Sequence, residues 1–259
     1  MMLDKFEKIF IETNNEWGYI ILPNDVDENI PLVLHFHGNG GYVNEQGSDW
    51  IDEPRKQKFF LPVLESGFAI AGCHATGNHW GRQSALDANY KFFEELKNIE
   101  KLNLNGITTW GCGLGASAAW LSTINELNDH VSNFISQQGV LNYESIIKHE
   151  KFKDDLVESH GFDVNISVND AIDIFQKINP INITENAVKN KNTKIPNSLF
   201  IHGDSDENVD FQENPIMLHQ ILDNNGFNSE IHALSGVGHA TYEHGEALGI
   251  LIANFISKS

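Results

Sequence analysis

Cysteine is scarce in this 259-residue sequence, which contains only Cys73 and Cys112. Two cysteines cannot form the disulfide framework of a small secreted protein, and a chain of this length buries enough surface to fold without one. The first residues include acids and no apolar core of the kind found in secretory signal peptides. We therefore expect both thiols to be reduced and the protein to be cytoplasmic.

Basic residues and long apolar runs are also few. The sequence has 17 Lys and Arg against 36 Asp and Glu, a formal net charge of −19. Affinity for nucleic-acid phosphates and for anionic membrane surfaces depends on clustered Lys and Arg, so this balance argues against both as partners. Apolar runs such as residues 31–36 and 67–73 are far too short to cross a bilayer.

Motifs that hold metals or nucleotides are missing as well. The sequence has 12 histidines, and His35 and His37 alternate along one predicted strand, but no His-Glu-x-x-His or Cys-x-x-Cys spacing occurs. Zinc sites normally show such clustering. No Gly-x-Gly-x-x-Gly follows the first strand, and no Gly-Lys-Ser/Thr loop is present. We therefore expect neither a metal nor a cofactor.

Short apolar runs do alternate with helical patterns, which is typical of an open α/β sheet covered by helices. The first two strands are expected to form a hairpin. Because ligands of such sheets bind at the carboxyl ends of the strands, the loops there are the candidates for a site. Strands are expected at residues 8–11, 17–22, 31–36, 67–73, 107–112, 131–137, 198–202 and 229–234, and helices at 50–66, 85–97, 114–125, 213–224 and 242–257.

Residues 142–190 break this alternation. Two amphipathic helical stretches, at 144–158 and 168–177, are joined by Asn-rich segments. We interpret residues 142–190 as a lid inserted into one domain that spans residues 1–259.

The segment HGNGG at residues 37–41 follows the strand predicted at 31–36. Closely spaced glycines let the backbone turn sharply and leave N–H groups pointing into a cleft. Such groups can hold the oxyanion that forms during acyl transfer. A plain glycine-rich loop is the alternative interpretation.

The segment GCGLG at residues 111–115 lies between a predicted strand and a predicted helix. A strained strand–turn–helix needs small residues two before and two after its apex, and it exposes the apex side chain above the helix N-terminus, where negative charge is stabilised. Gly111 and Gly115 meet this requirement. The apex itself is Gly113, which has no side chain to react.

An acid and a histidine follow the last two predicted strands. Asp206 lies in HGDSD at residues 202–206, and His239 ends GVGH at residues 236–239. An acid in this position can fix the imidazole tautomer and stabilise its charged form. Each residue alone is more often part of an ordinary loop, but combined with the two glycine segments the pair favours a catalytic site.

Taken in order, these four segments resemble the α/β-hydrolase superfamily, particularly its esterase, dienelactone-hydrolase-like and peptidase-like branches. The resemblance runs from about residue 31 to residue 243. It implies a three-layer α/β/α sandwich with an eight-stranded, mostly parallel sheet, and a small-molecule substrate with a carboxylic ester or related acyl bond. It also implies that the strand at 31–36 separates the strands ending at Cys73 and Cys112, so that no disulfide joins them.

The resemblance further implies roles for particular residues. One oxyanion donor falls at Asn39 or Gly40 and another at the backbone N–H of Leu114, while Asp206 and His239 match the acid and the base. The loop at 74–82 lies beside the active site of the resembled fold, so His79 and Trp80 are candidates for substrate binding. A surface loop with one packed Trp is the alternative. Trp50 and Phe152, at helical spacing, are expected in the core.

This sequence departs from the family at the nucleophile position, which corresponds to Gly113. Cys112 should face the opposite side of the strand, and we interpret Ser117 as a small residue that packs the following helix against the sheet. Three interpretations remain open: substitution of a catalytic serine, a natural pseudoenzyme or ligand-binding protein that keeps the pocket, and His–Asp chemistry without a covalent intermediate. With glycine at position 113 we expect no acyl-enzyme. No feature of the sequence indicates the oligomeric state.

Overall fold

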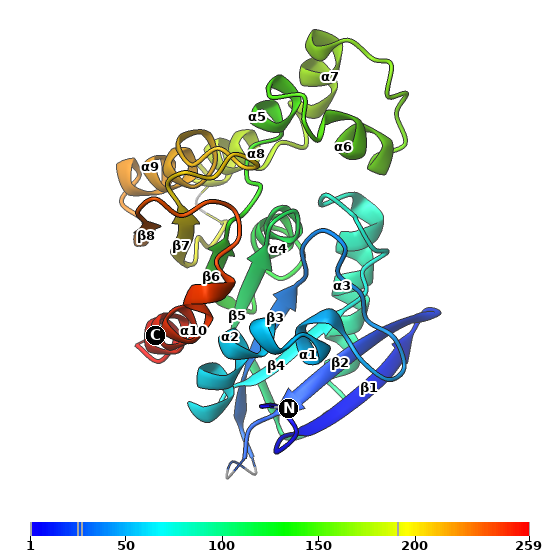
Figure 1. The fold of residues 1–259 in the computed structure, drawn as a ribbon, viewed down its shortest axis with the longest axis vertical. Helices are drawn as coiled ribbons and strands as arrows, with labels where there is room; N and C mark the ends of the chain where they lie inside the picture. The colour runs from blue at the N-terminus through cyan, green and yellow to red at the C-terminus, as the bar shows by residue number, and fades with distance from the viewer. Residues whose placement is uncertain (1, 25, 27, 191, 259) are drawn as a thin grey trace.

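The computed structural model describes residues 2–24, 26, 28–190 and 192–258. In this part of the chain eight strands form one sheet, with helices on both faces (Figure 1). The strands are β1 (Glu7–Thr13), β2 (Glu16–Leu22), β3 (Ile30–Phe36), β4 (Ala69–Cys73), β5 (Leu102–Cys112), β6 (Val131–Gln137), β7 (Asn197–Gly203) and β8 (Ser229–Leu234). Their order is β1-β2-β4-β3-β5-β6-β7-β8. Strand β2 is antiparallel to both its neighbours, and the remaining pairs are parallel.

Two hydrophobic layers cover the sheet because side chains alternate along each strand. In β3, Leu32 and Leu34 belong to the apolar cluster on one face, and Val33 belongs to the cluster on the other. Helices α3 (Gln83–Leu96), α4 (Gly115–Ile124) and α9 (Met217–Asn224) supply the first layer. Helices α1 (Asp49–Asp52), α2 (Pro54–Glu65) and α10 (Gly245–Ile256) supply the second. The three-layer sandwich expected from the sequence is confirmed.

The strand order confirms the expected placement of the two cysteines. Strand β3 lies between β4 and β5, so it separates Cys73 from Cys112, and both thiols are free and buried.

Several element boundaries differ from the sequence-based expectation. The helix expected at 50–66 is two helices, because Pro54 starts α2 at its first position, where a proline is favourable. The two C-terminal helices are each preceded by a separate turn, a π-helical one at Gln212–Ile216 and a 3-10 one at Tyr242–His244. Strand β5 starts at Leu102, five residues before the expected start.

The segment between β6 and β7 contains α5 (Tyr143–Lys148), α6 (Lys153–Ser159), α7 (Val168–Phe175) and α8 (Pro180–Ala187). The single helix expected at 144–158 is broken because Glu150 adopts a left-handed backbone conformation with φ of 59°. Helices α5, α6 and α7 lie together beyond one end of the sheet (Figure 1). They share an apolar cluster around Tyr143 and Phe175 that is distinct from the two layers of the sheet.

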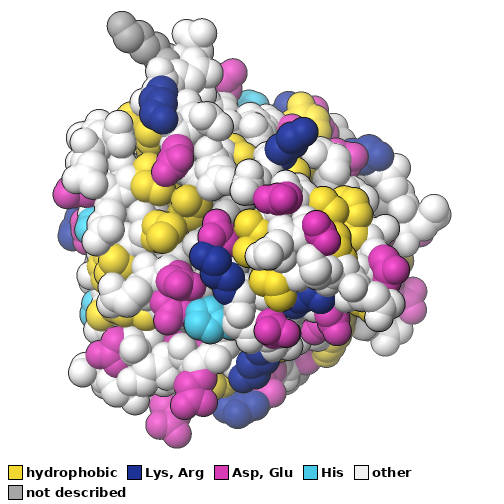
Figure 2. All heavy atoms as spheres, turned by 90° about the horizontal axis from the view of Figure 1, so that it is seen from above, with side chains coloured by type: hydrophobic (Ala, Val, Ile, Leu, Met, Phe, Trp, Pro, Cys, Tyr) yellow, Lys and Arg dark blue, Asp and Glu magenta, His cyan; other side chains and the backbone are white. Residues whose placement is uncertain are grey.

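On the face of the molecule seen from above, acidic side chains are interspersed with basic side chains and small apolar patches (Figure 2). Among the described helices, none combines the length and the apolar composition that a membrane span requires.

Candidate active site

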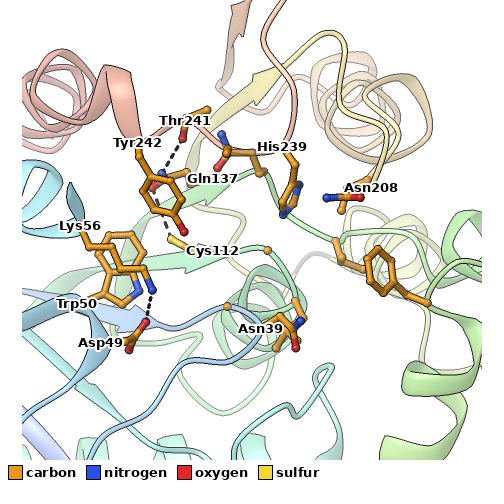
Figure 3. Close-up of a pocket in the computed structure, with 18 of the residues that line it drawn as sticks. Asn39, Asp49, Trp50, Lys56, Cys112, Gln137, Asn208, His239, Thr241 and Tyr242 are labelled. Atoms are coloured by element: carbon orange, nitrogen blue, oxygen red, sulfur yellow. Dashed lines mark hydrogen bonds and ion pairs between the residues drawn. The ribbon is translucent and has the colours of Figure 1, made fainter. Parts of the chain in front are cut away.

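A cavity of about 290 Å³ lies where the loops after β3, β5 and β8 meet (Figure 3). Gly38 and Asn39 come from the first loop, Gly113 and Leu114 from the second, and His239 from the third. The segment between β6 and β7 contributes Val140 and Phe152 as apolar lining. The carboxyl ends of the strands thus bring together segments that are far apart in the sequence, as expected for an open α/β sheet.

The turn after β5 is tightly packed on both sides of its apex. A Cβ atom at Gly111 would lie 2.4 Å from the Cα of Ala116, and one at Gly115 would lie 2.3 Å from the carbonyl oxygen of His37. Gly113 lies between them with φ of 52°, and a Cβ there would meet only the Cα of Gly38, at 3.8 Å. The turn therefore excludes side chains at 111 and 115 but has room for one at 113, which is the geometry of a nucleophile elbow.

His239 and Asp206 are hydrogen bonded. The Nδ1 of His239 lies 2.7 Å from Oδ2 of Asp206, and the imidazole ring points into the cavity (Figure 3). The other carboxylate oxygen accepts the N–H groups of Asn208 at 2.8 Å and Val209 at 3.0 Å. With Nδ1–H donated to the carboxylate, Nε2 is the nitrogen that remains to accept a proton in the cavity.

The environment of Asp206 keeps it ionised. Burial by itself raises the pKa of this carboxyl, but the hydrogen bonds from His202 and His239 and the charge on His239 outweigh burial, so the pKa lies well below its ordinary value. An ionised carboxylate is the form that stabilises an imidazolium on His239.

His202 is a part of this network to which the sequence analysis gave no role. Its ring is buried, and Nε2 lies 2.9 Å from the carbonyl oxygen of Val209 and 3.1 Å from Oδ2 of Asp206. Its Nδ1 has no hydrogen-bond partner among the described residues. The only signal in the sequence was the position of His202, near the end of β7 and four residues before Asp206.

Two backbone N–H groups at the cavity are available to an oxyanion. Asn39 and Leu114 both line the cavity, and within the described chain neither backbone N–H is hydrogen bonded. The N–H of Gly40 donates instead to the side-chain oxygen of Asn78 at 2.7 Å. The sequence did not distinguish Asn39 from Gly40 as the first oxyanion donor. In the structure the N–H of Asn39 is free to donate, and that of Gly40 is already hydrogen bonded.

The two residues considered for substrate binding differ in position. Trp80 lines the cavity, and its carbonyl oxygen accepts the hydroxyl of Tyr143 at 2.7 Å. His79 is fully buried outside the cavity lining. Its Nδ1 accepts the N–H of Gly81 at 3.1 Å, and its ring packs against His37. In this structure His79 supports the loop, and only Trp80 faces the cavity.

Neither alternative nucleophile is placed to react. Ser117 is fully buried, and its hydroxyl donates to the carbonyl oxygen of Val140 at 2.6 Å. Cys112 borders the cavity, although we expected it to face away, and its sulfur lies 3.6 Å from Nε2 of His35. Burial raises the pKa of the Cys112 thiol and lowers the pKa of the His35 imidazole, so both are neutral. Because the thiolate is the reactive form of cysteine, this pair lacks the activation of a catalytic thiol.

Aromatic residues that helical spacing assigned to the core are also found at the cavity. Trp50 and Phe152 both line it, as do Tyr242, Asp49 and Lys56, which no motif identified. In the described part of the chain, no three His, Cys, Asp or Glu side chains converge so as to hold a metal ion.

Solved structures with the same fold include enzymes of several kinds. Acylaminoacyl peptidase of Pyrococcus horikoshii is 16% identical with a TM-score of 0.73, and the match covers 97% of this chain but 42% of that chain. Est1E of Butyrivibrio proteoclasticus is 16% identical with a TM-score of 0.68, covering 97% of this chain and 98% of that one. S-formylglutathione hydrolase of Agrobacterium tumefaciens is 8% identical with a TM-score of 0.73, covering 97% and 94%. No curated protein matches the sequence significantly.

The sheet order and these structural likenesses define an α/β-hydrolase fold. Within that class, the chain belongs to the prolyl oligopeptidase family, whose sequence model matches residues 73–256. The matched region contains the elbow, Asp206 and His239. This chain spans less than half the length of the acylaminoacyl peptidase that it matches.

Proposed function

We propose that the cavity is a hydrolase site for a small molecule with a carboxylic ester or related acyl bond, and that position 113 is its nucleophile position. In this scheme a serine at 113 attacks the acyl carbon while Nε2 of His239 accepts the hydroxyl proton. Asp206 holds the imidazole and stabilises its charged form. The N–H groups of Asn39 and Leu114 hold the oxyanion.

The observation that carries this proposal is the space at Gly113. A glycine apex with φ of 52° and an open side next to the cavity is flanked by two glycines that tolerate no side chain. The His239–Asp206 pair and two unoccupied N–H groups at the same cavity support it. As written, with glycine at 113, the chain binds the acyl compound but forms no acyl-enzyme.

We further propose that the segment at 142–190 acts as a lid within one hydrolase domain. Phe152, which follows α5, reaches the cavity, and the hydroxyl of Tyr143 connects α5 to the loop that carries Trp80. The two free, buried thiols support a reducing compartment, the cytoplasm. The net charge of −19 supports a small-molecule partner rather than nucleic acid or an anionic membrane.

Turnover of a panel of p-nitrophenyl esters by three proteins tests the function. The chain with Gly113 should hydrolyse them at background rates, and Gly113→Ser should create esterase activity. Gly113→Ser/His239→Ala should lose it again, because removing one member of a triad lowers kcat by roughly 10⁴–10⁶. Folded Gly113→Ser without activity on any ester would show that the pocket is not a hydrolase site. His239-dependent turnover by the chain with Gly113 would instead favour chemistry without a covalent intermediate.

A further inference from the structure

One end of the cavity carries a charged pair that the hydrolysis scheme does not use. The Nζ of Lys56, on α2, lies 2.6 Å from Oδ2 of Asp49, on α1, and both side chains are largely buried. Figure 3 shows the pair beside Trp50, on the side of the cavity opposite Asn208 and across from His239. The rest of the lining is mixed, with Phe152 and Trp80 beside polar residues such as Asn208. Among the described lining residues, the cavity therefore carries an ion pair at one end only.

Lys56 is an unusual lining residue for this protein. Among the described residues that line the cavity it is the sole Lys or Arg, in a chain with a net charge of −19. Withdrawing an ion pair from water has a desolvation cost, and apolar side chains of similar size often stabilise such a position as well or better. A paired lysine beside the cavity is therefore more readily explained by a ligand than by stability.

Hydrogen-bond donors at this end are in excess. An ammonium group has three N–H donors, and Lys56 donates only to Asp49 among the described residues while lying over the Trp50 ring. The indole N–H of Trp50 and the hydroxyl of Tyr242 also lack a hydrogen-bond partner in the described structure, and both residues line the cavity. We call Trp50, Lys56 and Tyr242 the donor end of the cavity.

The acceptors at this end are already engaged. The Asp49 carboxylate accepts Lys56 on one oxygen and the N–H of Tyr42 on the other, at 3.2 Å. The side-chain oxygen of Gln137 accepts the indole N–H of Trp110 at 3.2 Å. A ligand group that enters here meets three groups with open donors, beside a carboxylate that is already paired with Lys56. The matching chemistry is an oxygen acceptor, and because hydrogen bonds from an ammonium group are strongest to ionised acceptors, we expect an anionic one.

We propose that the donor end binds a carboxylate carried by the substrate, with Lys56 as the residue that selects it. The substrate class is then an ester or related acyl compound with a carboxylate at a distance from the scissile bond. This inference rests on the proposed function, because the donor end and the elbow share one cavity. If Lys56 only ties α1 to α2, its loss should affect stability and not selectivity.

Binding to the chain with Gly113 tests the inference without requiring catalysis. Isothermal titration calorimetry compares monoethyl glutarate with neutral diethyl glutarate, and 3-acetoxypropanoate adds an ester with its carboxylate on the alcohol side. The variants are Lys56→Gln, Lys56→Arg and Asp49→Asn/Lys56→Gln, the last of which leaves no buried charge unpaired. Lys58→Gln is the matched control, since Lys58 lies on the same helix but is exposed.

We expect at least one charged ester to bind the chain with Gly113 more tightly than diethyl glutarate does. Lys56→Gln and the double variant should weaken that binding roughly 10- to 100-fold, as expected for a hydrogen bond between charged groups, with diethyl glutarate unaffected. Lys56→Arg should retain most of the preference, and Lys58→Gln all of it. Equal binding of charged and neutral esters, or equal losses for both in the double variant, would overturn the inference. An inactive Gly113→Ser protein that still shows Lys56-dependent carboxylate binding would instead refute the hydrolase function and leave a carboxylate-binding protein.

Discussion

Replacing the glycines of the turn after β5 by alanine, one at a time, tests the elbow without any substrate. Gly113→Ala adds a methyl group to open space but places a non-glycine residue at φ of 52°. Gly115→Ala places the same methyl group 2.3 Å from the carbonyl oxygen of His37, and Gly111→Ala places it 2.4 Å from the Cα of Ala116. Both of these contacts are with backbone, which cannot rotate away.

The three substitutions should therefore differ in magnitude. A left-handed alanine costs roughly 1–2 kcal/mol, and the lower entropy of the unfolded chain offsets about 0.4–1 kcal/mol of this. Gly113→Ala should thus lower the free energy of unfolding by about 1 kcal/mol. Overpacking against fixed backbone typically costs 1–3 kcal/mol or more, so Gly111→Ala and Gly115→Ala should each lose at least about 3 kcal/mol.

Urea unfolding followed by circular dichroism measures these differences, with Gly226→Ala as the matched control. Gly226 has φ of 79° and nothing within 4 Å of an added Cβ, so it isolates the backbone strain. Thermal unfolding should show a drop of about 2–4 °C for Gly113→Ala and for the control, and a drop several times larger for Gly115→Ala. Equal losses at 113 and 115 would refute the assignment of the apex.

Two further predictions concern Asp206 and the cysteines. Because the pKa of Asp206 in the folded chain lies below its unfolded value of about 3.9, its ionised form stabilises the fold above that pH, and this stabilisation is lost as the pH falls through the folded pKa. The difference in unfolding free energy between the unsubstituted chain and Asp206→Asn should therefore be largest at pH 7 and shrink towards pH 3. A difference independent of pH would contradict the conclusion that Asp206 is ionised in the folded chain. Thiol titration without reductant should count two thiols in denaturant. In the folded protein both thiols should react slowly, since both are buried and burial raises the pKa of Cys73 to about 12. A Cys73–Cys112 bridge found by mass spectrometry would contradict the strand order.

The fold could be predicted where strands are continuous apolar runs. Strand β3 is such a run, and it was located with its boundaries nearly correct. The first half of β5 was missed because its polar and glycine residues, in LNLNG, do not differ from a loop in composition. The break between α5 and α6 was missed because a glutamate at φ of 59° carries no turn signal in the sequence.

The glycine turn at residue 113 and the proximity of Asp206 and His239 could be predicted because their requirements are local. Glycines two residues either side of an apex reflect a steric rule, and the acid and histidine follow in a fixed order along the chain. The donor end could not be predicted, because Lys56 and Tyr242 reach the same cavity only through packing of α2 against the 3-10 turn at Tyr242–His244. Which of His79 and Trp80 faces the cavity depends on the backbone of their loop, in which Trp80 has φ of 47°.

The most direct test of the account is the site of covalent labelling by a fluorophosphonate probe. Peptide mapping by mass spectrometry should find the chain with Gly113 unlabelled, and Gly113→Ser labelled once, at residue 113, with the label lost in Gly113→Ser/His239→Ala. Labelling of the chain with Gly113 at Ser117 or Cys112, or a folded Gly113→Ser protein that does not react, would contradict the assignment of position 113 as the nucleophile position.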